Sequence, residues 1–207
     1  MRDPTFVYRV AIGLPIFALL LVYELWRRPK ESRRGKEYAF LFGVTLLAMA
    51  YGVLHDFVTW SICRDYYVVG KGIPSAASGY TIDVVKLAMK ATWTGGLLCA
   101  AAFLVANNPD RHRRQLPYFT LLQLMLIPLA SSILFESALG IAFGGFASSV
   151  ARRFGMMTYL ELSGPRFIAV WGMHIGAYSG AALGLLAGVA TIVVLKRRLP
   201  LPEDQPL

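Results

Sequence analysis

Long apolar segments constrain the fold of this chain more than any other feature of its sequence. A helix that crosses a bilayer needs about 20 mainly apolar residues, and five segments meet that requirement. Their approximate ranges are 6–26, 38–60, 84–106, 118–145 and 167–195. Because lipid offers no hydrogen-bond partners, each segment must satisfy its own backbone. We therefore expect an all-α, polytopic membrane helix bundle with about five transmembrane helices.

The organisation along the chain is that of one membrane domain over residues 1–199, with the lipid bilayer as its first partner. Residues 200–207 hold three prolines and cannot continue a helix, so we expect a disordered tail. The net charge is +9, but the basic residues fall between apolar segments rather than on a solvated face. Nucleic-acid binding is therefore not expected.

The basic residues predict the orientation of the helices. Short loops rich in lysine and arginine stay in the cytoplasm, and the link after the first apolar segment carries six basic residues within 27–36. Counting onward places the basic clusters at 111–114 and 196–198 on the same side, with the N-terminus outside and the C-terminus in the cytoplasm. The outer segment 61–83 contains Tyr66, Tyr67 and Tyr80, which suit the aromatic belt at the membrane interface.

A glycine stripe marks the last segment, where a glycine recurs every four residues. Such a stripe, also called a glycine zipper, lets a neighbouring helix approach closely. Gly140 and Gly144, or the small residues 88–100, are candidate neighbours within the chain; a membrane-protein partner or a second copy is the alternative. Pro128 should kink the fourth segment because it removes a backbone donor. The stripe consists of Gly172, Gly176, Gly180, Gly184 and Gly188.

Ionisable residues inside the apolar segments are the main functional clue. They are costly in hydrocarbon and usually face the interior of a bundle. With the helix directions above, four of the segments bring such residues to one layer, roughly 7 to 10 Å below the outer surface at about 1.5 Å per residue. The layer contains His55, Asp56, Lys90, Glu136 and His174, and Tyr51 and Tyr178 lie one turn from the two histidines.

Three functions are compatible with this layer. Imidazole and carboxylate are ordinary transition-metal ligands, which makes His55, Asp56, Glu136 and His174 a candidate metal site. The two histidines would alternatively bind a haem from opposite faces, or the group would relay protons for a transported solute. In a purely structural layer, Lys90 would instead pair with Asp56 or Glu136.

Two motifs resemble those of a functionally unassigned family of small bacterial multi-spanning membrane proteins. The run from His55 to Tyr67, HDFVTWSICRDYY, is similar to HD-x-(I/V)-T-Y followed by I-S-P-E-Y-F, and HIGAYSG from His174 is similar to H-N-x-S-Y-x-G. The resemblance implies a similar helical topology, and we separately expect a location in the bacterial inner membrane. It also singles out Thr59, Asp65 and Tyr67 as positions to test.

Taken together, these features predict a multi-pass inner-membrane protein with a polar or metal-binding site in the outer leaflet. Redox or metal-dependent chemistry on a lipid-soluble or periplasmic substrate is the leading hypothesis. The alternatives are a transporter of a small solute or ion, and a non-catalytic accessory or assembly subunit. The inner halves of the helices are nearly uncharged, which disfavours proton-coupled transport, and no catalytic motif assigns an enzyme class.

Overall fold

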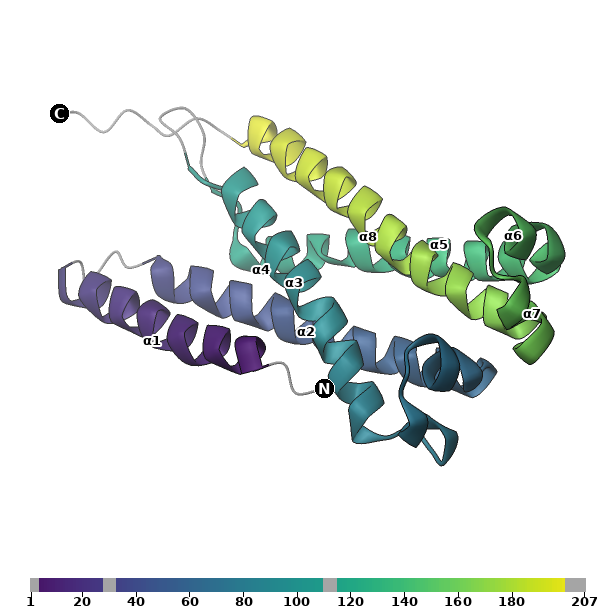
Figure 1. Cartoon of the computed structure of the whole chain (residues 1–207). Helices are drawn as coiled ribbons and strands as arrows, with labels where there is room; N and C mark the ends of the chain where they lie inside the picture. Colours follow the sequence, from purple (N-terminus) through teal and green to yellow (C-terminus); the bar gives the residue numbers. More distant parts are fainter. Residues whose placement is uncertain (1–3, 28–32, 110–114, 200–207) are drawn as a thin grey trace.

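The protein is a bundle of long helices (Figure 1). The structure is a computed structural model, and it describes residues 4–27, 33–109 and 115–199. Within these residues, four helices are long and apolar enough to cross a membrane, and four of the five expected segments fall on them. They are Arg34–Ile62 (α2), Ile82–Ala106 (α3), Tyr118–Gly145 (α4 and α5) and Pro165–Arg198 (α8).

The first expected segment falls within α1 (Pro4–Arg27), which lies beside α2. The Phe17 ring contacts the rings of Tyr38 and Phe42, and the Glu24 carboxylate accepts a 3.0 Å hydrogen bond from the backbone of Arg34. Since α1 is not among the four candidate spans, the count of five and the orientation of the termini stay predictions. The expected tail, 200–207, lies outside the described residues, as does the basic cluster at 111–114.

The bundle is built from two closely packed helix pairs, α2 with α3 and α5 with α8. Small residues bring each pair together. In the first pair, Gly52 faces Thr92 and Gly96 faces Ala48. In the second pair, four glycines of the stripe on α8 lie against α5, while Gly188 lies against Phe103 of α3.

The glycine stripe of α8 is therefore already packed against other helices of the same chain. An added Cβ on Gly176 would meet the backbone of Phe135 and Glu136, and one on Gly172 would lie 2.7 Å from the carbonyl oxygen of Leu139. Gly140 and Gly144, the predicted neighbours on α5, face Met173 and Ala169. Docking of a partner through the stripe stays a prediction, and such a partner would have to displace α5.

The fourth span is interrupted, as Pro128 predicts. Its first part, α4 (Tyr118–Leu124), is separated from α5 (Leu126–Gly145) by a single residue, Met125. Pro128 has no N–H to donate to the carbonyl four residues earlier, that of Leu124, so the regular helix breaks at Met125. The break redirects α5 along α8.

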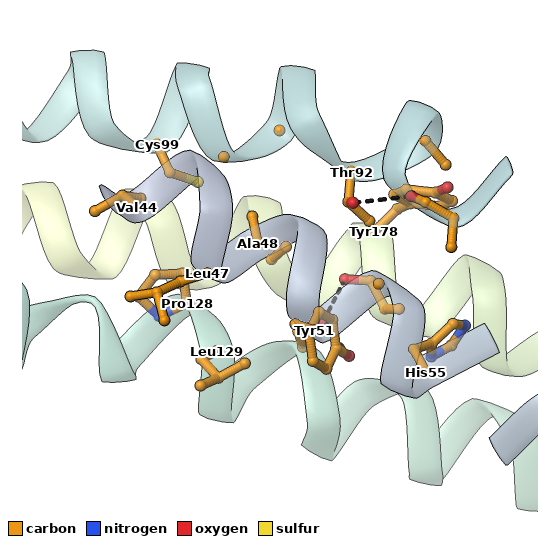
Figure 2. A pocket seen from close by; sticks show the side chains of 18 of the residues that line it. Val44, Leu47, Ala48, Tyr51, His55, Thr92, Cys99, Pro128, Leu129 and Tyr178 are labelled. Carbon is orange, nitrogen blue, oxygen red and sulfur yellow. Dashed lines mark hydrogen bonds between the residues drawn. The ribbon is translucent and has the colours of Figure 1, made fainter. Parts of the chain in front are cut away.

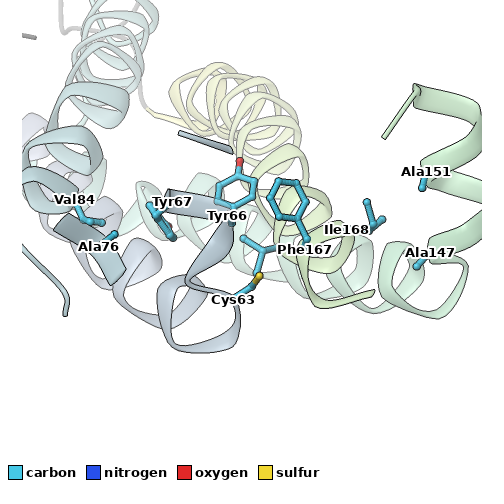
Figure 3. Close-up of a cluster of buried hydrophobic side chains, with 10 residues drawn as sticks. Cys63, Tyr66, Tyr67, Ala76, Val84, Ala147, Ala151, Phe167 and Ile168 are labelled. Atoms are coloured by element: carbon cyan, nitrogen blue, oxygen red, sulfur yellow. The ribbon is translucent and has the colours of Figure 1, made fainter. Parts of the chain in front are cut away.

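The end of the bundle opposite Arg198 is closed by short elements between the spans (Figure 1). These are the π-helix η1 (Tyr66–Gly70), the 3-10 helix η2 (Pro74–Ala77), α6 (Ala147–Phe154) and α7 (Met157–Ser163). Figure 3 shows their buried side chains meeting Phe167 and Ile168 of α8. Tyr66 and Tyr67, which we expected in the lipid interface, are buried here instead, because η1 folds back over the ends of α2 and α8.

A second buried cluster fills the other end of the bundle, where Phe40, Phe103 and Ile192 meet. Lys196 is buried at this end, and its ammonium group donates to the carbonyl oxygens of Ala106 at 3.1 Å and Asn108 at 2.6 Å. It thereby satisfies carbonyl groups at the end of α3 that lack partners in their own helix. The basic residues 33–36 and 196–198 thus lie at the same end of the bundle.

Candidate metal centre

A cavity of about 240 Å³ lies between the two buried clusters (Figure 2). All four spanning helices line it, and its wall is apolar along most of its length. At the end nearer η1 the wall becomes polar, with side chains from α2, α5 and α8. The polar lining residues there are Tyr51, His55, Asp56, Ser132, His174 and Tyr178, and Thr92 of α3 lies close to them.

His174 is held in one orientation by its own helix. Its Nδ1 lies 2.9 Å from the carbonyl oxygen of Val170, one turn earlier on α8. Because a carbonyl oxygen only accepts, Nδ1 carries a proton, and in the neutral imidazole this leaves the lone pair on Nε2. That Nε2 lies 3.4 Å from Oδ1 of Asp56, while the Tyr66 ring lies against the imidazole with centroids 4.6 Å apart.

His55 is buried, with 8% of its surface exposed, and neither ring nitrogen has an aligned hydrogen-bond partner. Its Nδ1 lies 3.0 Å from Oε1 of Glu136, which is close enough for a hydrogen bond but poorly aligned for one. Its Nε2 lies 3.9 Å from Oδ1 of Asp56. A buried nitrogen without a partner costs free energy, so this side chain favours a ligand on Nε2.

Glu136 belongs to a chain of hydrogen bonds that joins three helices. The Tyr51 hydroxyl on α2 lies 2.8 Å from Oε2 of Glu136 and 3.0 Å from the Ser132 hydroxyl on α5. Ser132 in turn donates to the carbonyl oxygen of Ala177 on α8 at 2.9 Å. The carboxylate is thereby fixed with Oε1 3.0 Å from Nδ1 of His55, where a small rotation of the ring would let Nδ1–H donate to it and leave Nε2 free.

Asp56 lies at the centre of the arrangement, 5% exposed. One ligand atom each from His55, Asp56 and His174 lies within 4.8 Å of the other two. Behind the cluster, the Thr59 hydroxyl donates to the His55 carbonyl oxygen at 2.9 Å and bonds the Tyr67 hydroxyl at 2.6 Å. Burial, and after it the nearby charge of Asp56, raises the pKa of Tyr67, so this phenol stays protonated.

Two imidazoles and one carboxylate form an ordinary ligand set for Zn²⁺ or Fe²⁺. Ligand atoms about 2.0–2.2 Å from one ion lie at most about 4.4 Å apart, so small side-chain rotations would bring the three groups to coordination distance. A haem fits less well. The rings of His55 and His174 have centroids only 4.6 Å apart and are inclined at 79°, which leaves no room for a porphyrin between two coaxial imidazoles.

The structure brings most of the predicted site residues together, but not all. Tyr51, Thr59 and Tyr67 support the cluster, and Tyr178 lines the cavity one turn from His174. Asp65 is exposed just before η1, and Lys90 is exposed on α3; neither belongs to the three-residue cluster or lines the cavity.

Two supporting residues were not predicted from the sequence. Ser132 lies one turn before Glu136 on α5, and that spacing could have identified it as a neighbour. Tyr66 contacts His174 only because η1 folds back over the bundle, and no local pattern predicts that return.

The chain was compared with protein-family models, with curated proteins and with solved structures, and none of the three comparisons gives a significant match. The functional assignment therefore rests on the geometry of the site.

Proposed function

We propose that this chain is a metal-binding membrane protein whose ion is held in the outer leaflet by His55, Asp56 and His174. The observation that supports this most directly is the orientation of the imidazoles. Each histidine has an acceptor beside Nδ1, Glu136 or the Val170 carbonyl, and each directs Nε2 toward Asp56. Metal-binding histidines generally have such an acceptor on the other ring nitrogen.

The charges of the site favour a divalent ion. Two carboxylates, Asp56 and Glu136, are buried among apolar helices, where uncompensated negative charge is expensive. The ionisable nitrogens that lie within 4.0 Å of these carboxylates are those of His55 and His174. One divalent cation would balance both charges and would also use the lone pairs of His55 and His174.

In this proposal Glu136 is a positioning residue rather than a ligand. Its carboxylate contacts Nδ1 of His55 and the Tyr51 hydroxyl, so it orients the imidazole and raises its basicity toward the ion. Three protein ligands leave at least one coordination position for water or substrate, which is typical of catalytic rather than structural metal sites. Metal-dependent chemistry on a lipid-soluble or periplasmic substrate is thus our proposed activity.

The cavity supports transport less well. A proton-coupled transporter needs polar groups that continue across the membrane, yet beyond Tyr51 and Ser132 the described lining is apolar as far as Val44 and Met125. An accessory role without chemistry would not require the convergence of both Nε2 atoms on one carboxylate.

The direct test is metal analysis of the purified protein by inductively coupled plasma mass spectrometry. Wild type should carry about one equivalent of a first-row transition metal, or take it up when Zn²⁺ or Fe²⁺ is added. Asp56→Asn and His174→Ala should lose it. Asp83→Asn, which removes an exposed carboxylate at the start of α3, is the matched control and should keep the metal.

Two results would contradict the proposal. One is a wild-type protein that neither contains metal nor binds added Zn²⁺ or Fe²⁺. The other is a folded His174→Ala variant that binds as much metal as wild type.

A further inference from the structure

The cavity extends far beyond the metal centre. On α2 its lining runs from Asp56 back to Val44, which at about 1.5 Å per residue is a distance of roughly 18 Å. On the facing helix α3, small residues from Ala88 to Cys99 form the wall. A volume of about 240 Å³ over that length makes a narrow slot, polar at one end only.

The slot opens toward lipid between α2 and α5. These two helices belong to different pairs and are not closely packed along their length; near the metal centre they are joined through the side chains of Tyr51 and His55. Beyond that bridge, Leu47 of α2 and Leu129 of α5 line the cavity while 58% and 37% exposed. In a bilayer this exposed surface faces hydrocarbon, so a lipid can enter the slot sideways.

Entry from the aqueous end is blocked. Tyr66 and Tyr67 of η1 are 4% and 0% exposed and lie over His174, with ring centroids 4.6 and 6.3 Å from the imidazole. The other end of the slot is closed by the cluster around Phe40 and Phe103. The exposed lining that the described residues leave therefore lies along the sides of the slot, at Leu47 and Leu129 between α2 and α5 and also at Tyr178 of α8, which is 55% exposed.

We propose that the slot binds an uncharged lipid with a single hydrocarbon chain, whose hydroxyl or carbonyl oxygen lies at the metal centre. This inference rests on the proposed function, and it names the substrate class of the same site. The length and narrowness of the slot fit one chain rather than two. The lining between Val44 and Tyr51 offers apolar contacts to such a chain and few hydrogen bonds.

The charge of the site selects the headgroup. A divalent ion together with Asp56 and Glu136 is already neutral. An anionic headgroup would leave a net negative charge in a low-dielectric region, which is costly. A neutral oxygen avoids that cost and still fills the open coordination position. A long-chain alcohol should consequently bind better than the carboxylic acid of the same length.

The test uses the full chain in detergent or nanodiscs with a photoreactive, diazirine-bearing hexadecanol as the probe. After illumination, mass spectrometry should locate the label on the slot-lining parts of α2 or α5. Unlabelled hexadecanol should compete about tenfold more strongly than hexadecanoic acid, a difference of about 1.4 kcal/mol. The metal content of the same samples is measured in parallel.

Matched glycine variants make the test specific to the slot. Gly95 lines the cavity, and a Cβ added there meets nothing within 4 Å, so Gly95→Leu should fill the slot without a clash. Gly43 of α2 has equally open surroundings but does not line the cavity, which makes Gly43→Leu the control. We expect Gly95→Leu to lose most of the labelling and to keep its metal, and Gly43→Leu to behave as wild type.

The outcomes separate the two proposals. Equal labelling of Gly95→Leu and wild type, or stronger competition by the acid than by the alcohol, would overturn the lipid proposal even if the metal is present. Labelling that is sensitive to Gly95→Leu in a protein that binds no metal would support the lipid slot and refute the metal centre.

Discussion

At the scale of single residues, the cluster depends on which ring nitrogen of each histidine is free. The backbone of α8 sets the tautomer of His174, whereas that of His55 depends on Glu136, and Glu136 depends on Tyr51. His55 is thus the proposed ligand whose orientation rests on side chains of two helices. Substitutions at the supporting residues therefore test this chain of contacts while His55, Asp56 and His174 stay unchanged.

Tyr51→Phe should weaken metal binding while the fold persists. The change removes the hydroxyl that contacts Glu136 and Ser132, and loss of such an outer partner typically lowers metal affinity by about 10–100-fold. Competition with a chelating dye measures the effect. Tyr38→Phe, on the same helix but near its other end, is the control; an unchanged affinity in Tyr51→Phe would refute this role of Glu136.

Tyr67 gives a prediction about alkaline pH. Burial and Asp56 raise its pKa in the folded protein above the ordinary value of 10.0, so the stabilisation is complete below about pH 10 and is lost as the pH rises from there toward the folded-state pKa. Wild type should therefore lose stability above about pH 10. Tyr67→Phe should be less stable at neutral pH by about 1 kcal/mol, but its alkaline decline should be shallower.

Thermal unfolding between about pH 8 and about pH 11 tests this. Thr59→Val is the control because it removes the same hydrogen bond to Tyr67 but leaves the titrating phenol in place. Identical alkaline slopes in wild type and Tyr67→Phe would show that another group causes the decline.

At the scale of helices, glycine determines how α5 and α8 pack. Gly176 lies against the backbone of Phe135 and Glu136, which cannot move aside as a flexible side chain can. Because Glu136 is part of that contact, the packing of the two helices also sets the distance from Glu136 to His55. The stripe thereby links helix packing to the geometry of the candidate metal centre.

Gly176→Ala should destabilise the protein and lower its metal affinity together. Overpacking of this kind costs about 1–3 kcal/mol, and each kcal/mol lowers Tm by about 2–4 °C in a chain of this size. Thermal unfolding in detergent with and without metal measures both effects. Gly43→Ala, where the added Cβ has open space, should leave Tm and metal affinity close to those of wild type.

Features of the fold and the site that depend on residues close together in the sequence could be predicted from it, whereas features that depend on residues far apart could not. Periodicity and apolar length placed four spans, and Pro128 predicted the break before α5. The common depth of His55 and His174 followed from counting along helices of predicted direction, and their rings do lie in contact. The return of η1 over His174 could not be predicted, because it depends on packing between residues about 100 apart in the chain.

At the scale of the whole molecule, the basic clusters 33–36 and 196–198 lie together at one end of the bundle, around Arg33, Arg34 and Lys196. The basic residues at the opposite end, such as Arg64 and Arg166, are more scattered along the chain. The opposite end is closed by η1, η2, α6 and α7. The positive-inside rule therefore predicts that the basic end faces the cytoplasm and that the metal centre lies in the outer leaflet.

Cysteine labelling in intact cells tests this orientation. In a variant without Cys63 and Cys99, Ser148→Cys on α6 should react with a membrane-impermeant maleimide, and Arg197→Cys on α8 should react only after the cells are lysed. Both positions are exposed in the structure. The reverse pattern would place the metal centre in the inner leaflet.

The seam between the two helix pairs has a mechanical consequence. Asp56 of α2 contacts His174 of α8, and Tyr51 and His55 of α2 contact Glu136 of α5. These contacts connect the two helix pairs, which are otherwise loosely packed beside the slot. An ion bound by residues of both α2 and α8 would hold the two helix pairs together more tightly. Its loss would let the pairs rotate relative to each other about the apolar cluster near Phe103. The chemistry of three side chains would then govern the stiffness of the entire bundle.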